Sequence, residues 1–168
     1  MYLCEDRLAV IVNNYSFPTE LKPEEVYRMP CTPQAFVKVY DIEDRENPGL
    51  TRTVILNGIL SGSRLIGEFI YAVINQQAVK TGGNQTDLEV VLPPISGDYT
   101  EVVQPTEIRY VDASDASYRF TTVVAVNILD EGQKPTYESF LAGQTSQLYI
   151  SLNNMYLVVP QHPCLDST

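Results

Sequence analysis

The feature that most constrains the fold of this chain is a strictly alternating segment over residues 118–129. In an extended chain, successive side chains point to opposite faces, so a period of two separates the segment into two rows. The first row is mostly apolar, and it consists of Tyr118, Phe120, Thr122, Val124, Val126 and Ile128. The second row is more polar, with Arg119, Thr121, Val123, Ala125 and Asn127. The pattern predicts a β-strand whose first row faces the core.

Further strands are expected on both sides of this segment. Residues 35–42 and 51–60 are joined by a charged loop that contains Pro48 and Gly49, which predicts a hairpin. A second hairpin is predicted between residues 107–112 and 118–129, and a third over 147–159, where Asn153-Asn154 suits a tight turn. Residues 87–92 form a short strand candidate. Residues 4–14 are compatible with strand or helix, because an apolar run this short does not separate the two.

Residues 61–80 carry the best helical pattern in the chain. Apolar residues recur there at the three-and-four spacing of one helical face: Leu65, Ile66, Phe69, Ile70, Val73, Ile74 and Ala78. Ser61 or Ser63 would cap the start, and Gly82-Gly83 would end it. Within this helix, Gly67 would mark the close approach of a neighbouring backbone. Shorter helical segments are predicted over residues 19–29 and, as one turn, over 136–142.

These elements predict an α+β fold: a mostly antiparallel, sandwich-like β-sheet with one long amphipathic helix packed on it. The alternative is an all-β barrel flanked by one helix. At 168 residues with 44% hydrophobic content, the chain suits a single domain over residues 1–168. Residues 1–34 would be an N-terminal extension, and residues 130–168 a C-terminal arm or extra hairpin.

The charge composition limits the kinds of partner that the chain is expected to bind. Eleven Lys plus Arg against twenty-one Asp plus Glu give a net charge of −10, which disfavours binding to nucleic-acid phosphates and to anionic lipid. Residues 1–7 are acidic and lack the cationic head of a signal peptide, and no apolar run approaches a membrane span. A reducing cytosol is therefore expected for synthesis. The cysteines Cys4, Cys31 and Cys164 are too scattered for a metal motif and are expected to be free thiols.

Catalytic motifs are scarce. The chain has no nucleophile elbow, dinucleotide fingerprint or P-loop, and its single histidine, His162, is expected to be solvated near the end. Because these motifs are missing, we expect no enzyme, no cofactor and no metal. A hydrolase that uses scattered carboxylates is the weaker alternative. Two acidic clusters could offer oxygen ligands to Ca²⁺, but neither has EF-hand spacing, so both are expected to be solvated loops. They are Asp41, Glu43, Asp44 and Glu46, and Asp112, Ser114, Asp115 and Ser117.

One arrangement of elements resembles a known family. The strand and predicted helix over residues 51–80, the turn at 58–63, the hairpin around 112–117 and the strand 118–129 resemble the tail terminator and tail-completion proteins of long-tailed bacteriophages. The resemblance implies a small α+β protein with one helix on a curved sheet. It also implies assembly into hexameric rings at the head-proximal end of the tail tube.

The function expected on this basis is that of a non-enzymatic virion structural protein, made in the host cytoplasm: a ring-forming tail terminator, neck or head–tail connector component. Its partners would be further copies and other virion proteins, without specific nucleic-acid or membrane binding, although DNA would pass through a ring lumen with an acidic lining. A tail tube or capsid decoration protein is a close variant.

Residues for subunit contacts are suggested by strand faces and by the abundance of tyrosine, with eleven Tyr and five Phe. The long strand 118–129 would also offer an exposed edge to a neighbour. The residues expected at the oligomer interface are Tyr118, Val123, Ala125, Asn127, Tyr149 and Tyr156. The alternative from another class is a small-ligand-binding β-rich module, with a cavity lined by Tyr118, Phe120, Phe69 and Tyr71.

Overall fold

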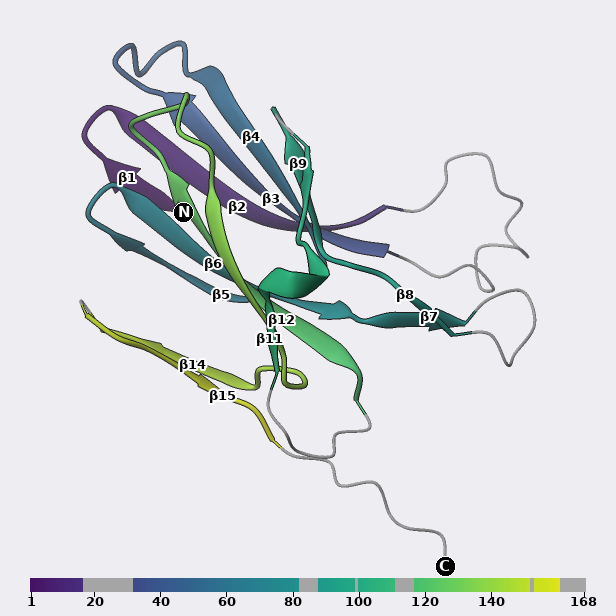
Figure 1. Ribbon diagram of the computed structural model, residues 1–168. Helices are drawn as coiled ribbons and strands as arrows, with labels where there is room; N and C mark the ends of the chain where they lie inside the picture. Colours follow the sequence, from purple (N-terminus) through teal and green to yellow (C-terminus); the bar gives the residue numbers. More distant parts are fainter. Residues whose placement is uncertain (17–31, 82–87, 99, 111–116, 152, 161–168) are drawn as a thin grey trace, which may run out of the picture.

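The protein is built from layers of β-sheet stacked on one another (Figure 1). The structure is a computed structural model that describes residues 1–16, 32–81, 88–98, 100–110, 117–151 and 153–160. Within those residues the regular structure is almost wholly β, and the one helical element is a single 3-10 turn, η1 (Pro105–Glu107). No described helix has the length and apolar character needed to cross a membrane.

The first sheet begins with four antiparallel strands that are neighbours both in the chain and in space. They are β1 (Tyr2–Cys4), β2 (Arg7–Ser16), β3 (Thr32–Asp41) and β4 (Gly49–Asn57). Two short strands extend the sheet beyond β4, namely β9 (Pro94–Gly97) and β10 (Glu101–Val102).

The second sheet repeats this plan. Four antiparallel strands again follow one another across the sheet: β5 (Ile59–Ile66), β6 (Phe69–Gln77), β12 (Arg119–Asn127) and β13 (Thr136–Leu141). The strand β11 (Ile108–Tyr110) pairs in parallel with β13 at the outer edge. The long connection from β6 to β12 thus adds strands to the outer edges of both sheets, and it also contains the small hairpin of β7 (Val79–Thr81) and β8 (Leu88–Val90).

A third layer consists of the hairpin of β14 (Gln147–Ile150) and β15 (Met155–Val158), drawn in yellow-green below the second sheet in Figure 1. The first strand of each layer contacts the first strand of the next layer. The Tyr2 hydroxyl of β1 donates a hydrogen bond to the backbone oxygen of Ser63 in β5, at 2.6 Å. A Cβ at Gly62 in β5 would lie 2.8 Å from Cδ2 of Leu148 in β14.

The hydrophobic core lies between the first and second sheets. Every second residue of β2, β3 and β4 faces inward and meets the inward row of β6 and β12. Burying each aliphatic side chain of this kind contributes about 1.5–3 kcal/mol. The core includes Ala9, Val37, Val39, Val54 and Leu56 of the first sheet, and Ile70, Ala72, Ile74, Val124 and Val126 of the second.

Two buried polar groups hold the layers in register. Arg52 on β4 is 2% exposed and donates to the backbone oxygens of Asn127 and Asp130, at 2.9 Å each, and to that of Gln133. Asn75 on β6 donates to the backbone oxygen of Thr145 at 3.1 Å, and its own side-chain oxygen accepts from the Thr145 amide. Arg52 thus joins the first sheet to the second, and Asn75 joins the second sheet to the segment that leads into β14.

The predicted α+β fold is wrong, because the long helix expected over residues 61–80 is replaced by the strands β5 and β6 and the described residues form an almost wholly β structure. The second sheet is covered on both faces, so β6 is apolar on both sides, and a nearly continuous apolar run matches helical spacing as well as strand spacing. Ile66 and Phe69 pair across a two-residue turn. Gly67 starts that turn at φ +58°, as a type II′ turn requires, so it marks a turn and not the close backbone approach that was expected.

Three smaller predictions are corrected as well. Residues 136–142 were expected as a helical turn, but they contribute β13. Residues 107–112 were expected to pair with 118–129, but β11 pairs with β13 and in parallel. Residues 4–14, left open between helix and strand, lie mostly in the strand β2. The helix predicted over residues 19–29, most of the cluster at Asp112, and Cys31, His162 and Cys164 lie outside the described residues.

Other predictions are confirmed. The hairpin predicted from residues 35–42 and 51–60 is the β3–β4 hairpin, with a register shift between Val39 and Tyr40, although β4 ends at Asn57 and Ile59 already belongs to β5. Residues 147–159 form the β14–β15 hairpin. The alternating segment is the strand β12, and its expected core row is buried at Val124, Val126 and Ile128.

Candidate interaction surface

The outer face of the first sheet is rich in apolar side chains, with Lys38 and Thr53 lying among them. Because Ala9, Val37 and Leu56 point toward the second sheet, their chain neighbours point the other way. Val12, Phe36 and Ile55 form one cross-strand row of this outer face, since Val12 pairs with Phe36 and Phe36 with Ile55. Val12 is 46% exposed. We call this surface the outer face; its apolar residues are Leu8, Val10, Val12, Phe36, Tyr40 and Ile55.

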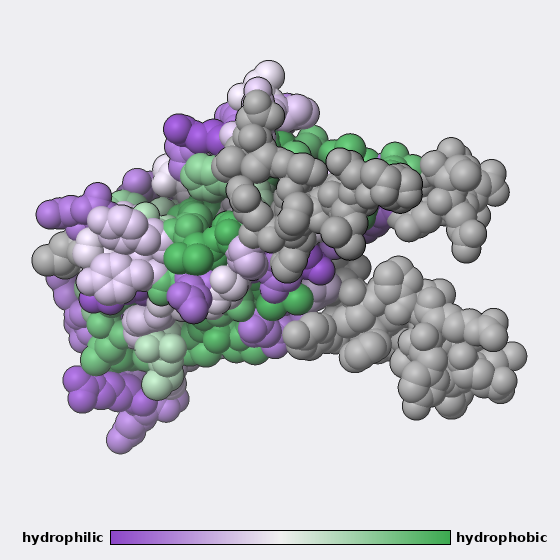
Figure 2. Space-filling view, turned by 90° about the horizontal axis from the view of Figure 1, so that it is seen from below, coloured by the Kyte–Doolittle hydropathy of each residue, from purple (hydrophilic) through white to green (hydrophobic). Residues whose placement is uncertain are grey.

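The opposite end of the stack is the outward side of the β14–β15 hairpin. Tyr149 and Tyr156 pair directly across the hairpin and are 65% and 55% exposed. Their ring centroids are 6.0 Å apart and the rings are tilted by 39°. Val158 on the same side is also exposed, whereas Ile150 points inward and is buried. Figure 2, seen from below and therefore from the side of this hairpin, shows apolar side chains in the middle of this side of the molecule, bordered by polar ones.

The residues expected at an oligomer interface lie in three different places. Tyr149 and Tyr156 are adjacent on the third layer. Val123 and Ala125 are half-buried on the far face of the second sheet, in a strand that is paired on both sides, so β12 is not the exposed edge that was expected. The remaining two residues lie apart from these.

Asn127 and Tyr118 lie at opposite ends of β12. Asn127 is buried, and its amide donates to the side chains of Glu68 at 3.0 Å and Gln133 at 2.7 Å, so it orders the β5–β6 and β12–β13 turns. Tyr118 precedes the strand with φ +43° and is exposed.

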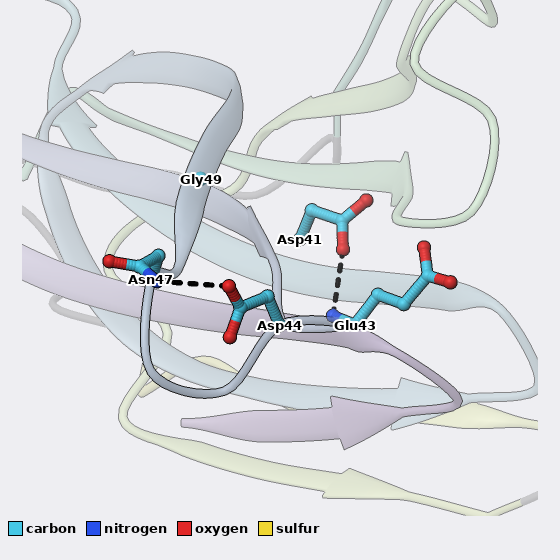
Figure 3. A pocket seen from close by; sticks show the side chains of 5 residues that line it. All are labelled: Asp41, Glu43, Asp44, Asn47 and Gly49. Atoms are coloured by element: carbon cyan, nitrogen blue, oxygen red, sulfur yellow. Dashed lines mark hydrogen bonds between the residues drawn. The ribbon is translucent and has the colours of Figure 1, made fainter.

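The acidic loop between β3 and β4 lines an open hollow of about 490 Å³ (Figure 3). Its carboxylates are used locally: Asp41 accepts from the Glu43 amide at 2.9 Å and pairs with Arg7 at 2.7 Å. Asp44 accepts from the Asn47 side chain at 2.9 Å, and this hydrogen bond lowers the pKa of Asp44. Among the residues that the structure describes, no three His, Cys, Asp or Glu side chains are grouped to hold a metal ion.

A second hollow, of about 560 Å³, lies where η1 and β11 meet β13. There the Tyr137 hydroxyl donates to the carboxylate of Glu107 at 2.8 Å. Burial, followed by this hydrogen bond, raises the pKa of Tyr137 to about 12. Arg109 and Glu138 form an ion pair at 3.0 Å across the exposed rim. The lining carries both signs of charge, so it selects no single class of charged ligand.

The four residues proposed for a ligand cavity do not line a common one. Phe69 pairs with Asn127, seven residues beyond Phe120 along β12. At roughly 3.3 Å per residue, this places the two aromatic residues about 23 Å apart. Phe120 instead borders an open apolar groove of about 440 Å³, which is lined by Val90, Leu92, Pro105, Ile108, Tyr110, Phe120 and Leu141.

The repeated sheets define a class of architecture. In a β-propeller, four-stranded antiparallel sheets follow one another along the chain and are arranged around a central axis. Here β1–β4 form one such unit, β5, β6, β12 and β13 form the next, and the first strands of successive layers are in contact. The model of the β-propeller domain family matches residues 1–166, and the chain belongs to that family.

No curated protein and no solved structure shows a significant match to the chain. The sequence reasoning missed this family because the segment over residues 61–80 was assigned to a helix. One signal could have corrected that assignment: Gly67 lies in the middle of the apolar run, where it suits a hairpin turn and costs a helix about 1 kcal/mol.

Proposed function

We propose that this chain is a non-catalytic assembly module that associates with further copies of itself into a closed ring of stacked sheets. The observation that carries the proposal is the apolar outer face of the first sheet. The inner faces of this stack are covered by neighbouring sheets, whereas Val10, Val12 and Phe36 face away from the second sheet and are part-exposed. Exposed apolar patches of this kind mark interaction surfaces.

The two ends of the stack suit a head-to-tail contact. The outer face lies at one end, and the hairpin side with Tyr149 and Tyr156 lies at the other. A contact between two different faces is heterologous, and it produces a ring when the rotation closes. A propeller closes with four to eight four-stranded sheets, and the described residues of one copy contribute two such sheets and one hairpin.

As the finer form of this proposal, the ring belongs to a virion, as a tail terminator, neck or connector component. Its support is the acidic, sheet-rich character of the chain. The helix that contributed to the resemblance is replaced by β5 and β6. We leave the passage of DNA out of the proposal, because the strands β1, β5 and β14, which would line a central opening, contain no Asp or Glu.

The test is the molar mass of the purified chain, measured by light scattering across a range of concentrations. We expect a species of several copies. Val12→Lys places a charge on the outer face and outside the core, so we expect it to reduce the mass to that of one copy while the circular dichroism stays unchanged. Leu88→Lys is the matched control, because Leu88 is 67% exposed on the separate β7–β8 hairpin.

Two outcomes would contradict the proposal. The first is a wild-type chain that remains monomeric at every concentration. The second is a Val12→Lys variant that keeps the mass of the assembly. Electron microscopy of the assembled species would then count the copies around the ring.

A further inference from the structure

The third layer has fewer strands than the two sheets before it. The first and second sheets each contain four successive antiparallel strands, whereas the described residues give the third layer only β14 and β15. β15 pairs with β14 on one side, and no described strand lies on its other side. Within the described part of the chain, the backbone N–H and C=O groups along that edge have no strand partner, and such groups can pair with an added strand.

The surface next to this edge is incompletely covered. Val73 on β6 and Val123 on β12 are register partners on the far face of the second sheet. Val73 is 0% exposed, but Val123 and its neighbour on this face, Ala125, are only half-buried. Leu148 of β14 covers Gly62 of β5, and the far face is fully buried at Val73 of β6 but only half-buried at Val123 of β12, so the cover thins from β5 toward β12. A strand added next to β15, at the usual spacing of about 4.8 Å, would extend that cover over β12.

We propose that the open edge of β15, together with Val123 and Ala125, binds an extended strand of a partner polypeptide. The bound strand would pair with β15 through its backbone and would direct alternate apolar side chains onto β12. Strand β3 of this chain shows the chemistry of such a segment, since Ala35, Val37 and Val39 alternate toward the second sheet while Phe36 and Lys38 point away. The inference goes beyond ring assembly, because it needs no second copy.

A second copy does not suit this edge. Antiparallel pairing of β15 with β15 of another copy would create one four-stranded sheet with a two-fold axis perpendicular to it. Both copies would then place their second sheets on the same side of the joined sheet. Each second sheet has two more strands, β12 and β13, beyond β6. The two second sheets would therefore overlap, which favours a partner segment that carries no sheet beneath it.

The probe for this site is a fluorescently labelled peptide with the sequence of residues 32–41, TPQAFVKVYD. We expect a saturable increase in anisotropy when the wild-type chain is added. Ala125→Lys puts a charge where the strand would lie, and we expect at least about tenfold weaker binding. Leu88→Lys, exposed on the β7–β8 hairpin, should leave the affinity unchanged. Circular dichroism checks that both variants are folded.

A second measurement keeps the wild-type protein and changes the peptide. Methylation of the backbone nitrogens at one set of alternate residues removes the donors that face β15, while methylation of the other set leaves them in place. We expect one set to weaken binding at least about tenfold and the other to have little effect. The proposal is overturned by absence of saturable binding, by equal effects of the two sets, or by displacement of the peptide as the protein self-associates.

Discussion

At the scale of single residues, Tyr137 is the side chain whose surroundings alter its chemistry most clearly. Its hydroxyl donates to Glu107, and burial together with that carboxylate opposes formation of a phenolate. The pKa of Tyr137 is therefore raised from 10.0 to about 12. A group that holds its proton more tightly in the folded state stabilises the fold while it is protonated.

We predict that Tyr137 contributes stability below about pH 10 and that this contribution is lost as the pH rises toward about 12. Ultraviolet difference titration of tyrosinate, comparing the wild type with Tyr137→Phe, should assign a midpoint of about 12 to this residue. In denaturant melts, the wild type should lose more stability than Tyr137→Phe over that interval. Equal losses in the two proteins would disprove the assignment.

At the scale of elements, the packing of the first sheet on the second depends on more than apolar contacts. Arg52 on β4 is buried, and its guanidinium donates to three backbone oxygens from the end of β12 and the turn that follows it. The hydrogen bond to Asn127 is buried and the other two are part-buried. Asn127 in the same turn is itself fixed by Glu68 and Gln133.

Arg52→Ala should lower the free energy of unfolding by about 3–5 kcal/mol, because it empties a buried position and leaves one buried and two part-buried acceptors without their donor. Arg64→Ala is the matched control: Arg64 is exposed on β5, and its removal should change stability by about 0.5 kcal/mol or less. Urea denaturation of the two variants and the wild type measures the difference. A loss below about 1 kcal/mol for Arg52→Ala would show that the contact between the sheets does not need this residue.

At the scale of the whole molecule, the layers differ in how well they are supported. The strands β6 and β12 are paired on both sides and contribute to the main core, whereas the β14–β15 hairpin is a two-stranded layer with two exposed tyrosines. Local opening costs least where few buried apolar contacts must be broken. The third layer should therefore open without unfolding the two sheets.

Hydrogen exchange should show this hierarchy directly. Amides of β14 and β15 should exchange at least about tenfold faster than those of β6 and β12 under native conditions. Asn75→Ala should widen the gap, because Asn75 anchors the segment that leads into β14 through Thr145. Equal protection of all four strands would mean that the three layers unfold as one unit.

Several local elements could be predicted from the sequence. The alternation over residues 118–129 gave a strand with the correct buried row, and the loops at Pro48-Gly49 and Asn153-Asn154 gave two hairpins. Short-range chemistry is sufficient in these cases, because a strand with one polar face has a clear period of two and a turn residue acts on its own neighbours. Tyr149 and Tyr156 were likewise placed on a strand surface by their sequence, although only the structure shows that they pair.

For a strand that is covered on both faces, only the tertiary structure showed that the segment is a strand and not a helix. Residues 69–77 are apolar on both sides because one face meets the first sheet and the other faces the third layer, so no polar row revealed their period. Gly67 before this segment suits a hairpin turn, but within residues 69–77 only the stacking of sheets distinguishes the strand from a buried helix. The same long-range packing pairs β11 with β13 and buries Arg52 against a distant turn, because these contacts join residues that no local pattern relates.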